Sequence, residues 1–152
     1  MMNKSKSFNW EEYISYGINI YKNYEDDEAM GRSGISRIYY GAFHLTLLCL
    51  QDTGFYPSTI GEGSHQAVIK SCKSLGEKDP EDNNNKLWRE LSTTLDRLKK
   101  QRKKADYSAR YFSDGDPLPH DLKRELCKAM HYAEDIKNKT KEIKQNEKDG
   151  TS

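Results

Sequence analysis

Leucine recurs at helical spacing through the most strongly patterned stretch of this chain. Between Lys86 and Tyr107, leucines stand at positions 87, 91, 95 and 98, separated by four, four and three residues. This spacing places the leucines in one stripe on a helix, whereas a half-buried strand would need strict alternation. A chain organised around such a stripe must cover it with other helices.

The same periodicity returns between breaks rich in proline and glycine. It predicts an all-α fold, an antiparallel bundle of about five helices in one domain. We expect the domain to span residues 10–145, between a flexible N-terminus at 1–9 and a disordered tail at 146–152. The predicted helices are Trp10–Tyr24, a second from Asp27 or Ser33 to Gln51, a third that follows Ser64 as its N-cap, Lys86–Tyr107 and Pro119–Gln145.

Composition excludes several classes of protein. The chain has 152 residues and a mass of 17.6 kDa, the size of one domain. Its net charge of +1 does not by itself indicate a nucleic-acid or membrane partner. No apolar run approaches the ~20 residues of a membrane helix and no secretory signal is visible, so we expect a cytoplasmic protein with no membrane partner. The three cysteines fit neither a disulfide framework nor a metal pair, and we expect no metal and no cofactor.

Two sets of polar residues interrupt the apolar pattern. Extending the leucine stripe by four and then three residues places Arg102 where an aliphatic side chain is expected, and Asp106 follows one turn later as an intrahelical partner. On the second predicted helix, Arg37, Tyr40 and His44 fall within roughly 60° of one another. A polar strip is therefore predicted along a helix that is otherwise buried.

An inward arginine is costly to bury unpaired, which leaves two interpretations. In the first, an ion pair of Arg102 stabilises one helix end, and Tyr40 and His44 are hydrogen-bonded core residues. In the second, the polar residues line a cationic cleft between two helices that binds a phosphate or a scissile phosphodiester. Gly41 and Ala42 beside the strip would let a neighbouring helix approach closely.

The C-terminal end of the fourth predicted helix is strongly basic. Residues 97–110 hold seven basic side chains and one acidic side chain. Basic residues interleaved with aromatic residues are typical of surfaces that bind single-stranded RNA or phosphate. The candidates here are Lys99, Lys103, Tyr107 and Arg110. The alternative is a solvated helix end whose cations complement the helix dipole.

Two motifs resemble those of a known family. Residues 36–44 read S-R-I-Y-Y-G-A-F-H and residues 102–107 read R-K-K-A-D-Y. In this order and spacing, the sequence resembles the small stand-alone branch of the HEPN superfamily, whose members carry S-R-x-Y-Y-x-A-F-H and R-x-x-A-D-Y. The resemblance covers residues 10–145. It implies a bundle that dimerises, a site at the dimer cleft, and membership of a group rich in toxin–antitoxin and phage-defence proteins.

Many HEPN proteins are metal-independent endoribonucleases, in which an arginine binds the scissile phosphate and a histidine shortly after it assists attack by the RNA 2′-hydroxyl. The resemblance assigns the phosphate contact to Arg102. No histidine follows Arg102 before His120, so His44 is the candidate acid/base residue, and Asp106 is expected to orient the arginine. The candidate RNA and phosphate contacts are Arg37, Tyr40, Lys99, Lys103, Tyr107 and Arg110.

The resemblance also implies protein partners: a second copy of the chain, forming a homodimer, and a minimal nucleotidyltransferase antitoxin. In HEPN toxins paired with such a transferase, a tyrosine near the motif can be adenylylated, and Tyr107 is the matching position. Two alternatives to a ribonuclease stay open. One is a non-catalytic HEPN module that binds RNA, nucleotide or the nucleotidyltransferase. The other is a scaffold in which the polar strip of Arg37 and Tyr40 is only a dimer interface.

Overall fold

The computed structural model describes residues 8–55, 63–79, 81–108, 111 and 122–149. Within these ranges the chain forms five α-helices and no strand, which confirms the predicted all-α bundle. The helices are α1 (Glu11–Lys22), α2 (Glu28–Asp52), α3 (Ser64–Lys78), α4 (Asn83–Tyr107) and α5 (Leu122–Lys148).

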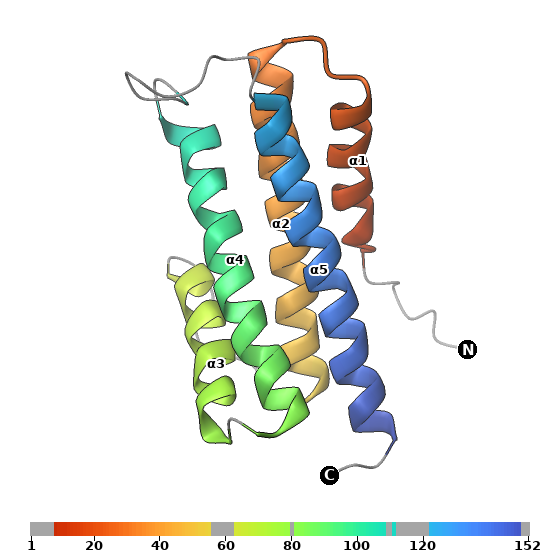
Figure 1. Ribbon diagram of the computed structural model, residues 1–152, viewed down its shortest axis with the longest axis vertical. Coiled ribbons are helices and arrows are strands. Elements are labelled where there is room, and N and C mark those ends of the chain that lie inside the picture. The colour runs from red at the N-terminus through yellow and green to blue at the C-terminus, as the bar shows by residue number, and fades with distance from the viewer. Residues whose placement is uncertain (1–7, 56–62, 80, 109–110, 112–121, 150–152) are drawn as a thin grey trace, which may run out of the picture.

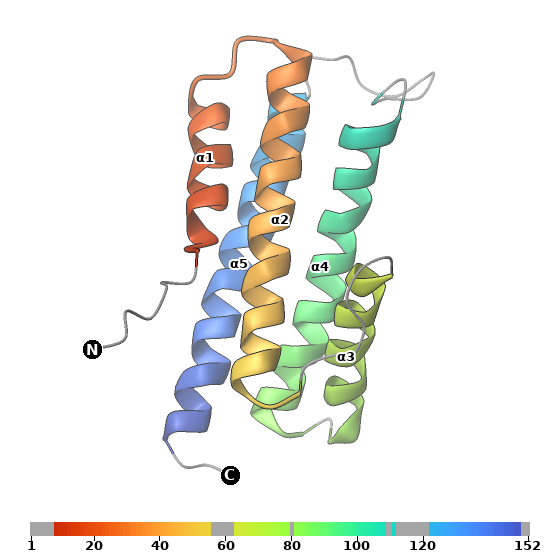
Figure 2. The same ribbon diagram turned by 180° about the vertical axis from the view of Figure 1, so that it is seen from behind.

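The three long helices α2, α4 and α5 form the centre of the bundle (Figure 1). Helix α1 packs on α2 and α5, whereas α3 packs mainly on α4 on the other side of the molecule (Figure 2). The consecutive pairs α1–α2, α3–α4 and α4–α5 are antiparallel, while α2 and α5 run in the same direction (Figure 1). The leucine stripe of α4 faces the centre and is buried throughout.

Most helix ends lie where the sequence predicts them. Asp27 caps α2, because its Oδ1 accepts a hydrogen bond from the backbone N–H of Met30 at 3.2 Å. The second helix therefore begins at the earlier of its two predicted positions. Ser64 was predicted as the N-cap of α3, and this is wrong. It is the first helical residue, and Gly63, with φ of 90°, occupies the cap position without a side-chain hydrogen bond.

The ends of the folded part differ from the predicted boundaries. Helix α5 continues to Lys148, and the backbone N–H of Asp149 donates to the Gln145 carbonyl at 3.0 Å, so the predicted tail begins later than residue 146. At the other end, Phe8 contacts the ring of Trp10 just before α1. Residues 1–7 and 150–152, and the predicted helix start at Pro119, lie outside the described residues.

Helix α1 approaches α2 closely at Gly41, as the sequence predicts. A Cβ atom added to Gly41 would lie 2.9 Å from the Trp10 carbonyl oxygen and 3.2 Å from the Ile14 amide nitrogen. These are backbone atoms, so a larger side chain would force the two helices apart. This close approach determines which neighbours the polar residues of α2 meet.

Candidate functional site

Arg102 lies near the C-terminal end of α4 and is only 6% exposed, so the prediction that it faces the interior is confirmed. Its guanidinium carbon lies 5.0 Å from the ring centroid of Tyr39, 5.4 Å from that of Tyr40 and 5.7 Å from that of Tyr107. Aromatic faces at such distances attract a cation. The site is therefore a buried guanidinium surrounded by tyrosines from α2 and α4.

The hydrogen-bonding capacity of this guanidinium is only partly used. Nη1 of Arg102 donates to the Tyr107 hydroxyl at 3.4 Å and lies 3.7 Å from Oδ2 of Asp106, which accepts from Ser36 at 3.3 Å. Strong guanidinium–carboxylate bonds are shorter, about 2.7–2.9 Å. The buried Nε has no hydrogen-bond partner within the part of the chain that the structure describes. The predicted pair with Asp106 is present, but it is long and leaves the buried Nε without an acceptor among the described residues.

A surface hollow of ≈ 410 Å³ lies against this cluster, between α2 and the end of α4. Tyr40 and Asp106, which contact Arg102, line the hollow together with Arg32 and Arg37. Arg32 is occupied in stabilising the end of α4, because its Nη1 donates to the carbonyls of Ala105 at 3.3 Å and Ser108 at 2.6 Å. We call this feature the α2–α4 hollow. It gives the Arg102 cluster a cationic, hydrogen-bonding surface.

His65, at the start of α3, joins the same cluster from the opposite side. Its Nδ1 lies 2.5 Å from the Tyr39 hydroxyl oxygen, and its ring stacks on Phe43 with centroids 4.2 Å apart. Burial, followed by the charges of Arg102 and Lys99, lowers the pKa of His65 to about 4. No role for this histidine follows from the sequence, because only the packing of α3 against α4 brings it near Arg102.

Tyr39 connects Arg102 to His65. Burial raises the pKa of Tyr39, and the charge and hydrogen bonding of Arg102 oppose this only in part, so the phenol keeps its proton at neutral pH. The Tyr39 hydroxyl is hydrogen-bonded to Nδ1 of His65 and so fixes the orientation of the imidazole ring. The sequence does not single out Tyr39 either, because it has the pattern of an ordinary core aromatic residue.

The predicted polar strip of α2 is divided between two neighbours. Tyr40 faces Arg102, whereas His44 stacks on Trp10 with ring centroids 3.6 Å apart and planes 10° apart. Arg37 is exposed and lies 5.0 Å over the ring of Tyr13. No hydrogen bond or ring contact joins His44 to Arg102 in the described structure, and burial lowers the pKa of His44. The structure thus brings Arg102, Asp106 and Tyr40 together but places His44 beside α1.

The remaining candidates surround the cluster. Lys99 donates from Nζ to Oε1 of Gln66 at 3.0 Å, and burial, followed by the charge of Lys103, lowers the pKa of Lys99. Lys103 is exposed. Tyr107 is 75% exposed although its hydroxyl contacts Arg102. Arg110 lies outside the described residues.

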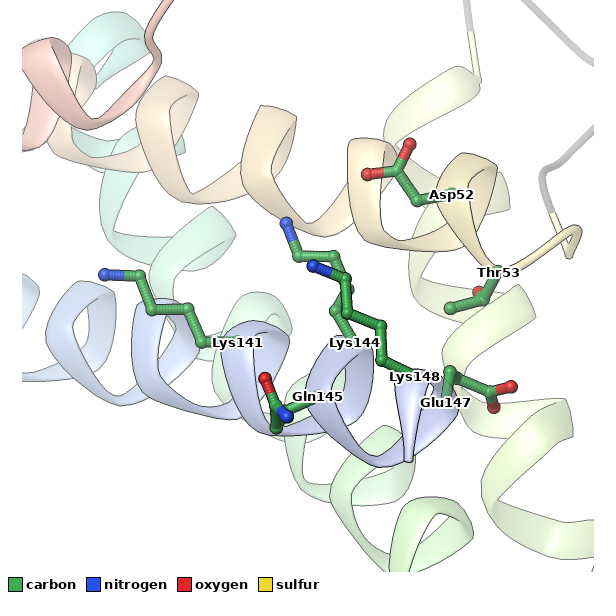
Figure 3. A pocket seen from close by; sticks show the side chains of 7 residues that line it. All are labelled: Asp52, Thr53, Lys141, Lys144, Gln145, Glu147 and Lys148. Atoms are coloured by element: carbon green, nitrogen blue, oxygen red, sulfur yellow. The ribbon is translucent and has the colours of Figure 1, made fainter. Parts of the chain in front are cut away.

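Figure 3 shows a second cationic hollow, of ≈ 760 Å³, which lies between the last turns of α2 and α5. Lys141, Lys144 and Lys148 of α5 line it opposite Asp52. Among the described residues, no group of three or more histidine, cysteine or acidic side chains could hold a metal ion. All three cysteines are free thiols. No helix in the described ranges has the length and hydropathy needed to cross a membrane.

Comparison with known proteins adds no relative: no family model, no curated protein and no solved structure matches this chain.

The low pKa of His65 predicts that acid destabilises the fold. In the unfolded chain His65 is protonated near its ordinary pKa of 6.5, but in the folded chain it stays neutral until about 4. Its contribution to the free energy of unfolding is therefore fully present above pH 6.5 and is lost as the pH falls toward 4. Urea unfolding within this window should show a smaller decline in stability for His65→Gln than for wild type. His131→Gln, a change at an exposed position on α5, should decline as wild type does.

Proposed function

We propose that the protein is an RNA-directed HEPN-type protein, a metal-independent endoribonuclease that acts as a homodimer in a toxin–antitoxin or phage-defence setting. The observation that carries the proposal is the buried guanidinium of Arg102, whose Nε has no partner among the described residues and whose neighbours Tyr40 and Asp106 line the α2–α4 hollow. A phosphodiester supplies the charge and the acceptor oxygens that this guanidinium lacks. The motif resemblance of residues 36–44 and 102–107 supports RNA as the source of that phosphate.

In the proposed mechanism, Arg102 binds the scissile phosphate and stabilises the charge that develops as the RNA 2′-hydroxyl attacks phosphorus. The attack breaks the bond to the 5′-oxygen, which takes a proton from solvent and leaves as a 5′-hydroxyl, and the other product ends in a 2′,3′-cyclic phosphate. Asp106, held by Ser36, orients the guanidinium. Tyr40 and Tyr107 line the site, while Arg37, Lys99, Lys103 and Arg110 attract the RNA backbone.

His65 supplies the acid/base group better than His44 does. It is neutral at physiological pH, Tyr39 orients its ring, and the charge of Arg102 acts on it directly. A neutral imidazole can accept the proton of the attacking hydroxyl. His44 contacts Trp10 and Phe43 and has no contact with the guanidinium in the described structure.

The experiment is cleavage of total tRNA in EDTA, with analysis of the product ends. Wild type should produce 2′,3′-cyclic phosphate ends. His65→Gln should cleave at least about 10²-fold more slowly, which is the usual contribution of an acid/base group. His44→Gln and the exposed His131→Gln are the matched controls and should stay close to wild type. If His44→Gln loses cleavage and His65→Gln does not, His44 is the acid/base residue and the role of His65 is structural.

A non-catalytic binding module is the second candidate function. It is favoured by the low exposure of Arg102, 6%, because the reacting phosphate must reach a guanidinium that Tyr107 partly covers. In that case well-folded wild type binds RNA in a salt-dependent manner and produces no new ends. The exposure of Tyr107, 75%, supports access by a nucleotidyltransferase partner under either candidate.

A further inference from the structure

A groove of ≈ 540 Å³ runs between α3 and α4, on the side of the bundle where α3 packs. Its lining includes two acidic side chains, Glu77 and Asp96. The basic side chains that line it are Lys70, Lys73, Arg89, Arg97 and Lys100. The excess of cations on α3 was not expected from the sequence, where the basic segment begins at residue 97.

Three of these cations are unpaired. Lys100 lies 3.2 Å from Asp96, and Arg89 donates from Nη1 to the Gly76 carbonyl at 3.3 Å. Lys70, Lys73 and Arg97 are exposed and make no ion pair within the part of the chain that the structure describes. The groove therefore presents an uncompensated positive charge to solvent.

The two walls of the groove are held rigidly. A Cβ atom added to Gly76 would lie 2.8 Å from Cα of Arg89, so the α3 and α4 backbones are in close contact there. The Ser92 hydroxyl donates to the Ile69 carbonyl at 3.2 Å, which joins the helices again. Because the helices are fixed, the residues that carry the unpaired cations keep a set spacing along both walls.

The groove leads to the Arg102 cluster. Gln66 lines the groove and accepts a hydrogen bond from Lys99, whose charge acts on the neighbouring His65. One end of the groove therefore lies beside Lys99 and His65, next to the Arg102 cluster.

We propose that the α3–α4 groove binds the phosphate backbone of single-stranded RNA, as a track separate from the Arg102 site. A protein partner would need an apolar core to its interface, but the only aliphatic side chain lining this groove in the described structure is the buried Ile69. A backbone, by contrast, is bound by cations alone. The lining also has no aromatic ring on which a base could stack, so binding should not depend on base sequence. The choice of RNA rests on the proposed function; the binding of a polyanion does not.

Fluorescence anisotropy of a labelled oligouridine of about 12 nucleotides tests the track. In EDTA, between about 50 and 200 mM salt, three unpaired cations should contribute about −2 to the slope of log affinity against log salt. The variant Lys70→Gln/Lys73→Gln/Arg97→Gln should lose this part of the slope and bind about tenfold more weakly at the middle of the range. Lys73→Gln alone should reduce the slope by about 0.7.

The matched control is Lys141→Gln/Lys144→Gln/Lys148→Gln, which removes the same charge from the hollow in Figure 3. It should bind RNA as wild type does, and circular dichroism should show that both variants have the helix content of wild type. The track is overturned if the groove variant keeps the wild-type slope, if the control variant loses as much, or if wild type binds no RNA. Equal competition by polyglutamate of the same charge, or preferred binding of duplex RNA, would also overturn the assignment.

Failure of the proposed function gives a different pattern. If wild type cleaves no RNA but the groove variant still loses salt-dependent binding, the track stands without the nuclease. If cleavage occurs and the groove variant binds and cleaves normally, the nuclease stands without the track. If the protein both cleaves RNA and binds it along the groove, the groove variant should need more RNA for half-maximal cleavage, while its rate at saturating RNA stays close to wild type.

Discussion

Replacing Arg102 with methionine should reduce RNA cleavage by about 10²–10³-fold, the usual cost of removing one group that stabilises the developing charge. Methionine has a similar length and no charge, so it fills the space among Tyr39, Tyr40 and Tyr107 without offering a donor to phosphate. Cleavage in EDTA, measured at several RNA concentrations, separates loss of binding from loss of turnover.

The same substitution should change the free energy of unfolding only slightly. Arg102 is buried with a donor unpaired and with a long contact to Asp106, and replacing such a cation by an apolar side chain is often neutral or stabilising. Asp106 is exposed, so it is not left as a buried unpaired charge. The attraction of the cation to the tyrosine rings is lost, but methionine packs on the same rings and the desolvation cost of the buried cation is removed with it, so these effects offset one another.

Lys86→Met is the matched control, since it removes one charge from an exposed position on the same helix. It should leave both cleavage and stability unchanged. If Arg102→Met lowers stability by several kcal/mol, or leaves RNA cleavage intact, Arg102 has the structural role of stabilising the end of α4.

The sequence predicts the fold well because one physical signal repeats in every helix. The leucine spacing on α4 predicts both the buried stripe and the inward direction of Arg102, and the structure confirms both. Gly41 likewise predicts a close helix neighbour, and α1 occupies that position. These predictions need only the geometry of a single helix, which local sequence determines.

The composition of the site could be predicted only in part. The residues Arg37, Tyr40 and His44 share one face of α2, but a face that wide contacts two neighbours, and α1 takes His44 while α4 takes Tyr40. His65 follows a glycine at the start of a short helix, and nothing local indicates that α3 packs beside Arg102. Contacts between helices depend on rotation and packing order, and a single sequence does not report these.

Leu95→Ala should destabilise the bundle by about 2–5 kcal/mol, the range for truncating a buried leucine. Leu95 is fully buried in the middle of the α4 stripe, between Leu91 and Leu98, on a helix that packs against α2, α3 and α5. Single domains are typically stable by about 5–15 kcal/mol, so the loss is a large part of the total. Urea unfolding followed by circular dichroism measures it, and Lys86→Ala on the exposed face should stay within about 0.5 kcal/mol of wild type.

The two substitutions on α4 separate structure from function along a single stripe. Leu95 and Arg102 both face inward, yet Leu95→Ala should lower stability and leave the cleavage rate of the folded fraction unchanged, because Leu95 lies two turns of α4 away from Arg102. Arg102→Met should lower the cleavage rate and leave stability nearly unchanged. A Leu95→Ala protein as stable as wild type would show that the stripe is not the centre of the core. If it were stable but inactive, the geometry around Arg102 would have to depend on packing two turns away.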